Sequence, residues 1–97
     1  MRTERDIRNQ IAYAYEEGKA MGFVEGYEKV FFAQRLLVVE YCRKQGFSED
    51  TINCLLPLEE EKKILRSRMI IELQKQGIGE DIIRSVFRIS REKPLLP

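Results

Sequence analysis

The sequence contains no histidine, no tryptophan and only two cysteines among its 97 residues. Histidine is the usual general acid or base at neutral pH and a common zinc ligand, so its absence removes the most frequent catalytic and metal sites. Cys42 and Cys54 lie twelve residues apart, a spacing that fits neither a disulfide framework nor a zinc site, and we expect both to be buried free thiols. We therefore expect no catalytic residue, no cofactor and no metal.

The chain also lacks a dominant charge and a long hydrophobic run. Its 17 Lys and Arg nearly balance 16 Asp and Glu, and the net charge of +1 attracts neither nucleic acid nor an anionic membrane. No stretch approaches the roughly 20 apolar residues that cross a bilayer, and residues 1–6 alternate in charge rather than opening a signal peptide. We expect one small, soluble, cytoplasmic domain (residues 1–97) of modest stability, which a partner or self-association would raise.

Proline is absent between residues 3 and 45, and apolar residues recur there at helical spacing. Thr3 is suited to cap the start of a helix and Gly46 to end it, so the pattern predicts one long helix over about 3–45. Two apolar stripes of different phase follow each other along it. The first consists of Ile7, Ile11, Ala14, Gly18 and Met21, and the second of Val24, Tyr27, Phe31, Val38 and Tyr41. The shift of phase predicts a bend or a change of partner near Gly22.

An internal repeat organises the rest of the chain. Residues 44–52 align with residues 75–83, and six of the nine pairs are identical. Each copy contains the end of an apolar helix, a glycine, an apolar residue, a capping position and the start of a short helix, which is typical of a helical hairpin. We expect a short helix at about 49–55, helices at about 59–76 and 80–90, and a frayed tail over 91–97. The fold class is therefore all-α, a long N-terminal helix followed by two repeated hairpins in a four-helix domain.

Two sequence patterns suggest other functions but receive little support. Glu17-Gly18-Lys19 and Glu60-Glu61-Lys62 match the Glu-x-Lys part of a nuclease metal site, yet such triplets are common on solvated helices and no strand is readable to supply a second acid. The repeated hairpin resembles a DNA-binding helix-turn-helix, but the candidate recognition helix opens on three consecutive glutamates that would repel phosphates. DNA binding would require the fold to gather dispersed arginines: Arg2, Arg5, Arg8, Arg43 and Arg84.

Small residues recur every four positions in the first half of the long helix. They are Ala14, Gly18, Gly22 and Gly26. Each interior glycine costs a helix roughly 1 kcal/mol relative to alanine, so the row is either a weak arm or a groove in which another helix can lie close. We expect the second, with the row flanked by the apolar anchors Met21, Phe23, Tyr27 and Phe31. These eight residues are the predicted homo-oligomer interface.

The segment Glu17-Gly18-Lys19-Ala20-Met21-Gly22-Phe23-Val24-Glu25-Gly26 resembles the Glu-Gly repeats near the C-terminus of the bacterial recombination-promoting nuclease family, also called Rpn or transposase-like PD-(D/E)xK proteins. The following Leu36-Leu37-Val38-Val39 and the stretch 44–52 are similar to the family's tail pattern of apolar helix, Lys-x-Gly, apolar residue, Ser and acidic pair. The resemblance covers roughly residues 14–90, which is the family's C-terminal helical part without its nuclease core.

The resemblance implies a short product that starts inside a nuclease gene and acts as an antitoxin. Such a product binds and inhibits the full-length DNA nuclease, so the expected partners are a second copy of this chain and that nuclease, with no membrane partner and no direct DNA binding. Two alternatives stay open: a small helix-turn-helix DNA-binding regulator, and a plain dimerisation domain of a nuclease. The sequence also leaves open the order of the oligomer and the relative orientation of its helices.

Overall fold

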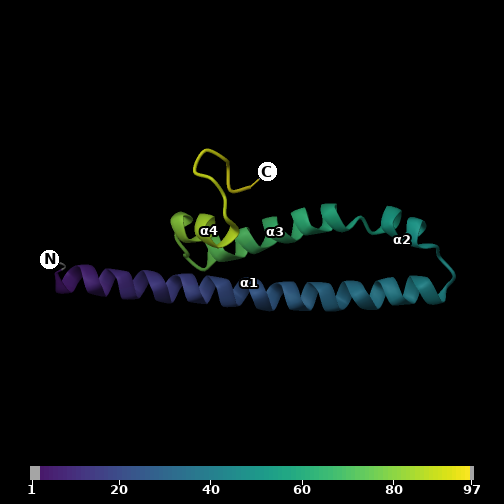
Figure 1. The fold of residues 1–97 in the computed structure, drawn as a ribbon, viewed down its shortest axis with the longest axis horizontal. Helices are drawn as coiled ribbons and strands as arrows, with labels where there is room; N and C mark the ends of the chain where they lie inside the picture. The colour runs from purple at the N-terminus through teal and green to yellow at the C-terminus, as the bar shows by residue number, and fades with distance from the viewer. Residues whose placement is uncertain (1–2, 97) are drawn as a thin grey trace.

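A computed structural model describes residues 3–96, which form four helices and no strand. The helices are α1 (Glu4–Lys44), α2 (Glu49–Leu55), α3 (Leu58–Lys75) and α4 (Glu80–Phe87). Helix α1 runs along almost the whole molecule, and α2, α3 and α4 return along one side of it (Figure 1). The predicted all-α class is thus confirmed.

Both ends of α1 carry the expected signals. The Thr3 hydroxyl accepts a hydrogen bond from the Asp6 backbone N–H at 3.3 Å, and the Asp6 carboxylate accepts one from the Thr3 N–H at 3.2 Å. This capping box satisfies two of the backbone donors that a helix start leaves free. At the other end Gly46 has a φ of +90°, a conformation that glycine adopts without strain. The helix stays continuous through Gly22, so the expected shift of apolar phase does not break it.

The repeated segment forms the same turn twice. Gly77 has a φ of +81°, close to that of Gly46, and each glycine is followed after two residues by the cap of the next helix. The apolar residue after the glycine differs in its role, since Ile78 is buried in the core while Phe47 remains exposed. The turn of the second hairpin therefore contributes Ile78 to the core, whereas the turn of the first hairpin leaves Phe47 in solvent.

Helix α4 ends at Phe87, three residues before the predicted end at about 90. Arg88 adopts the left-handed conformation (φ 55°), and the Arg84 guanidinium donates to the carbonyl oxygens of Ser90 and Lys93 at 2.6 and 2.7 Å. These bonds turn the chain back, so that Leu95 and Leu96 pack against the core. The described part of the predicted frayed tail is thus docked, and Pro97 lies outside the described residues.

The main core lies where α3 and α4 cross α1. Its buried members are Ala20, Ile70, Leu73, Ile78, Ile82 and Ile83, with Phe23 and Val24 of α1 packed against them. Within α1 only Ala20 and Val39 are buried. The expectation that the thiols are buried was wrong: Cys42 is half-buried and Cys54 is exposed, because neither position faces this core. The long helix thus contributes little to the core and leaves most of its surface open.

One partly buried ion pair joins α1 to the start of α3. The Arg35 Nε lies 2.7 Å from the Glu61 carboxylate, and its Nη2 donates to the Leu56 carbonyl oxygen at 2.9 Å. Hydrogen bonds to charged groups contribute more than neutral ones, so we expect Arg35→Ala to lower the free energy of unfolding by about 1 to 3 kcal/mol. Lys63→Ala, which removes an exposed pair with Glu60, should cost below about 1 kcal/mol. Urea unfolding of the three proteins measures the difference, and equal losses would contradict it.

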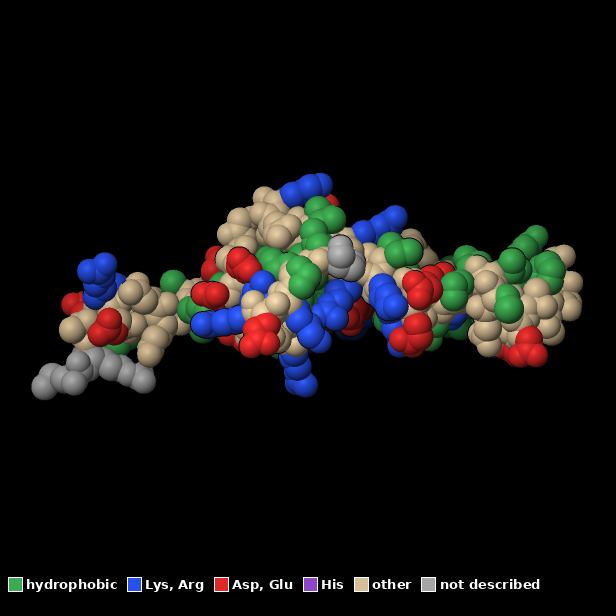
Figure 2. Space-filling model, turned by 90° about the horizontal axis from the view of Figure 1, so that it is seen from above, with side chains coloured by type: hydrophobic (Ala, Val, Ile, Leu, Met, Phe, Trp, Pro, Cys, Tyr) green, Lys and Arg blue, Asp and Glu red, His purple; other side chains and the backbone are tan. Residues whose placement is uncertain are grey.

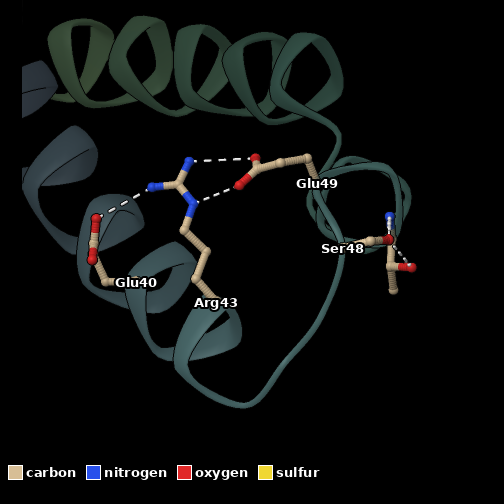
Figure 3. Close-up of polar contacts among 5 residues, drawn as sticks. Glu40, Arg43, Ser48 and Glu49 are labelled. Atoms are coloured by element: carbon tan, nitrogen blue, oxygen red, sulfur yellow. Dashed lines mark hydrogen bonds and ion pairs between the residues drawn. The ribbon is translucent and has the colours of Figure 1, made fainter.

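A more exposed ion pair spans the turn between α1 and α2. The Arg43 guanidinium binds both carboxylate oxygens of Glu49, at 2.7 and 3.3 Å, and also reaches Glu40 (Figure 3). The hydrogen bonds from Arg43 hold the pKa of Glu49 below its ordinary value. A carboxyl group with a lowered pKa in the folded state stabilises the fold above its unfolded pKa and loses that contribution as pH falls through the lowered value.

We therefore expect the melting temperature of the wild-type chain to fall on acidification more than that of Glu49→Gln. Thermal melts between neutral pH and about pH 2, below the ordinary carboxyl pKa, measure this difference. Glu60→Gln serves as the control, since the exposed ion pair of Glu60 with Lys63 bridges one turn of a single helix. If the melting temperatures of wild type and Glu49→Gln fell equally on acidification, the stabilising role of the Arg43–Glu49 pair would be contradicted.

Candidate interaction surface

Helix α1 exposes an unusual number of large apolar side chains. Of the fifteen exposed large hydrophobic residues within 3–96, eleven lie on it: Ile7, Ile11, Tyr13, Tyr15, Met21, Val30, Phe32, Leu36, Leu37, Val38 and Tyr41. Single exposed apolar residues are normal on soluble proteins, whereas contiguous exposed apolar patches mark interaction surfaces. Figure 2 shows that acidic and basic side chains intermix on the face seen from above and that no large area of one sign forms there.

The molecule is also much more extended than a self-contained domain of its size. It measures 66 × 26 × 23 Å, with a radius of gyration of 18.2 Å against about 12.5 Å for a compact chain of this length. Its accessible surface is 7628 Å², while the scaling for compact monomers gives about 5800 Å². The excess of about 1800 Å² is more than the roughly 800 Å² that each partner buries in a standard interface.

An open apolar groove of about 600 Å³ runs between α1 and α3. We call it the α1–α3 groove. Its α1 wall consists of Gly22, Phe23, Gly26, Tyr27, Val30, Phe31 and Gln34, and its α3 wall of Ile64, Leu65 and Arg68. The rings of Phe23 and Tyr27 lie 5.5 Å apart between centroids and form one stretch of the α1 wall.

The groove brings together five of the eight residues predicted for the interface. Gly22, Phe23, Gly26, Tyr27 and Phe31 line it. Ala14, Gly18 and Met21 are exposed on α1 outside it. The reason is helical geometry: with 3.6 residues per turn, residues four apart are rotated by about 40° relative to each other, so a long row spaced by four winds around the helix.

The remaining wall residues were not predicted from the sequence. Val30 and Gln34 continue the four-residue spacing of Gly22 and Gly26, and that continuation was the available signal. Ile64, Leu65 and Arg68 had no such signal, because only the packing of α3 on α1 places them there.

The glycines of the groove are not required by the fold of the single chain. A Cβ atom built on Gly22 or Gly26 meets nothing within 4 Å. Each glycine therefore reduces helix stability without relieving any contact inside this chain. An incoming helix, in contrast, can approach the α1 backbone closely at these two positions, as helices do across small residues.

The N-terminal part of α1 extends beyond α4 (Figure 1). It carries a second apolar surface. Ile11, Ala12 and Tyr15 lie together there on one exposed face, flanked by Arg8 and Glu16. We call residues 7–18 the α1 arm. The first apolar stripe is exposed from Ile7 to Met21. In the second stripe Val24, Tyr27 and Phe31 are half-buried, while Val38 and Tyr41 are exposed. The phase shift near Gly22 thus coincides with the start of a partly covered middle section of the helix.

The arginines considered for DNA binding are largely engaged elsewhere. Arg8 pairs with Glu4 at 3.1 Å, Arg43 with Glu49 and Arg84 with Glu80, both at 2.7 Å. Arg5 is exposed in the first turn of α1, and Arg2 lies outside the described residues. Arg5 and Arg8 belong to the start of α1, Arg43 to its end and Arg84 to helix α4.

Neither of the Glu-x-Lys triplets belongs to a cluster of metal ligands in residues 3–96. No group of three or more Cys, Asp or Glu side chains is placed there to hold a metal ion. Over the same residues, no helix combines the length and the apolar character needed to span a bilayer. The α1–α3 groove and the α1 arm are therefore the features that a function can be built on.

Comparison of the chain with protein-family models, with curated proteins and with solved structures gave no match. The resemblance to the Rpn family accordingly rests on the sequence of residues 17–26, 36–39 and 44–52 alone.

Proposed function

We propose that this chain is a non-catalytic interaction domain that associates with a second copy of itself through α1. The main support for the proposal is the uncovered apolar surface of α1, which includes the α1–α3 groove lined by Gly22 and Gly26. Burial of apolar surface is the main favourable term in protein association, and a small core such as this one gains stability from it. A symmetric dimer needs only one self-complementary surface, which a single long helix can supply.

The resemblance to the Rpn family supplies the biological role of this association. A full-length nuclease that ends in the same domain would present the same surface, so the short chain would form mixed oligomers with it. Such an oligomer lacks one catalytic half, and mass action favours it when the short chain is in excess. The proposed role is therefore that of a cytoplasmic antitoxin that inhibits the full-length DNA nuclease of its own gene.

Titration of the full-length nuclease with this chain tests the role. DNA cleavage should fall as the chain is added and should reach its minimum when the chain exceeds the nuclease subunits. The variant Gly22→Leu, which is expected to associate poorly, should inhibit much less at equal concentration. Undiminished cleavage in the presence of a chain that itself dimerises would contradict the antitoxin role and leave a plain dimerisation domain.

A further inference from the structure

We infer that the α1–α3 groove is filled by the α1 arm of a second copy, with the two α1 helices antiparallel and exchanging arms reciprocally. This inference rests on the proposed self-association and adds the identity of the docking segment, its direction and its register. Four observations support it. The arm and the groove have equal lengths, and they lie on the same side of α1. Charged residues at the two ends of the arm match the two ends of the groove in the antiparallel direction, and the surface area left uncovered is large enough for two such contacts.

The arm and the groove have matching lengths. The groove follows α1 from Gly22 to Gln34, and the exposed arm runs over residues 7–18. At 1.5 Å per residue these segments measure about 18 and 16 Å. An arm of one copy therefore spans the groove of the other from end to end.

The two surfaces also lie on the same side of α1, as a two-fold axis requires. In a helix of 3.6 residues per turn, Ile11 and Tyr15 of the arm point to the same side as Gly22, Gly26 and Val30. An axis between residues 20 and 21 then places Ile11 against the partner's Val30 and Tyr15 against the partner's Gly26. Close approach is possible where Tyr15 arrives, because no side chain projects from Gly26.

The charges at the ends of the arm select the antiparallel direction. Arg68 lines the groove and has no ion pair or hydrogen bond within residues 3–96. It lies toward the Gly22 end, since Glu61 pairs with Arg35 at the other end and Ile70 packs with Ala20. An antiparallel arm brings Glu16 to the Arg68 end and Arg8 to the Gln34 end, where an amide oxygen can accept its hydrogen bonds. A parallel arm would bring Arg8 to Arg68 instead.

The area available agrees with two such contacts. Each chain exposes about 1800 Å² more than a compact monomer of its mass. A reciprocal exchange covers both the arm and the groove of each chain, whereas a parallel coiled coil along the first apolar stripe would leave the groove open. We therefore assign the groove to the arm of a second copy.

Chemical crosslinking between different positions tests the register. In a background carrying Cys42→Ser and Cys54→Ser, we would prepare one chain with Ile11→Cys and another, tagged chain with Val30→Cys. The two are mixed, allowed to exchange and treated with a short bis-maleimide, which bridges thiols on helices packed 8 to 10 Å apart. The expected product is the mixed dimer of tagged and untagged chains, in several-fold excess over either homodimer.

The homodimers are the internal control. In the proposed arrangement two copies of residue 11 are separated along the helix by nineteen positions, about 28 Å, which a short linker does not span. A parallel pairing would instead crosslink Ile11→Cys to itself. Homodimer crosslinks alone, or no crosslink in a preparation whose sedimentation shows a dimer, would overturn the arm-in-groove assignment while leaving self-association intact. A preparation that sediments as a monomer would overturn both.

A charge reversal provides a second test that does not depend on thiols. A reciprocal dimer contains two Glu16–Arg68 pairs, so Arg68→Glu should weaken dimerisation about two- to thirtyfold, which corresponds to the loss of two exposed ion pairs, and Glu16→Arg in the same chain should restore it. Because each Glu16–Arg68 pair joins two copies, its loss or restoration changes the dissociation constant of the dimer. Sedimentation of the single and double variants measures that constant. A double variant as weak as Arg68→Glu alone would contradict the pairing of Glu16 with Arg68.

Discussion

Gly22→Leu is expected to strengthen α1 and to weaken the dimer at the same time. Leucine is a better helix former than glycine by roughly 0.8 to 1 kcal/mol, and a Cβ at this position meets nothing within 4 Å in the single chain. The same side chain enters the groove that we assign to the arm of a second copy. Forcing extra volume into a packed contact costs about 1 to 3 kcal/mol, so the dissociation constant should rise by about 5- to 150-fold.

The matched control is Gly22→Ala. Alanine has at least the helix propensity of leucine, but it adds a single carbon atom at the position that lines the groove. Both variants should show raised helix stability, while Gly22→Leu should show much the larger loss of association by sedimentation equilibrium. Tighter association of Gly22→Leu would contradict the interface.

Leu73→Ala is expected to have the largest effect on folding. Leu73 is fully buried where α3 and α4 meet α1, and its truncation leaves a cavity among Ile70, Ile83 and Ala20. Replacements of this kind cost 2 to 5 kcal/mol, which is a large part of the 5 to 15 kcal/mol that stabilises an ordinary domain. We expect the variant to lose the packing of α3 and α4 on α1 and, with it, the α1–α3 groove.

Leu55→Ala makes the same chemical change at an exposed position of α2, and its effect should stay within about 0.5 kcal/mol. Circular dichroism during urea unfolding compares the two variants with the wild type. Similar unfolding midpoints for Leu73→Ala and Leu55→Ala would contradict the position of the core.

The features that could be predicted from the sequence are those that local physics determines. The long helix follows from a proline-free run between Thr3, which caps it, and Gly46, whose positive φ ends it. The paired turns follow from the repeat of Gly46 at Gly77. For the proposed interface, the sequence signal is Gly22 and Gly26, whose cost in helix stability has no compensation within the chain.

The features that could not be predicted depend on contacts distant in sequence. The early end of α4 is accompanied by hydrogen bonds from Arg84 to the carbonyl oxygens of Ser90 and Lys93. No capping residue in the sequence marks this end of the helix. The α3 wall of the groove depends on which face of α3 packs on α1, and periodicity cannot determine this for a helix whose partner is unknown. Ala14 and Gly18 share the spacing of Gly22 but wind away from the groove, because a four-residue row drifts around the helix.

Sedimentation equilibrium over a dilution series shows whether α1 carries a self-complementary surface. We expect a reversible association in which the weight-average mass rises from that of one chain to that of two as concentration increases, with the rise displaced to higher concentration in Gly22→Leu. A mass that stays at one chain over the whole series, for a protein that remains folded, would contradict it.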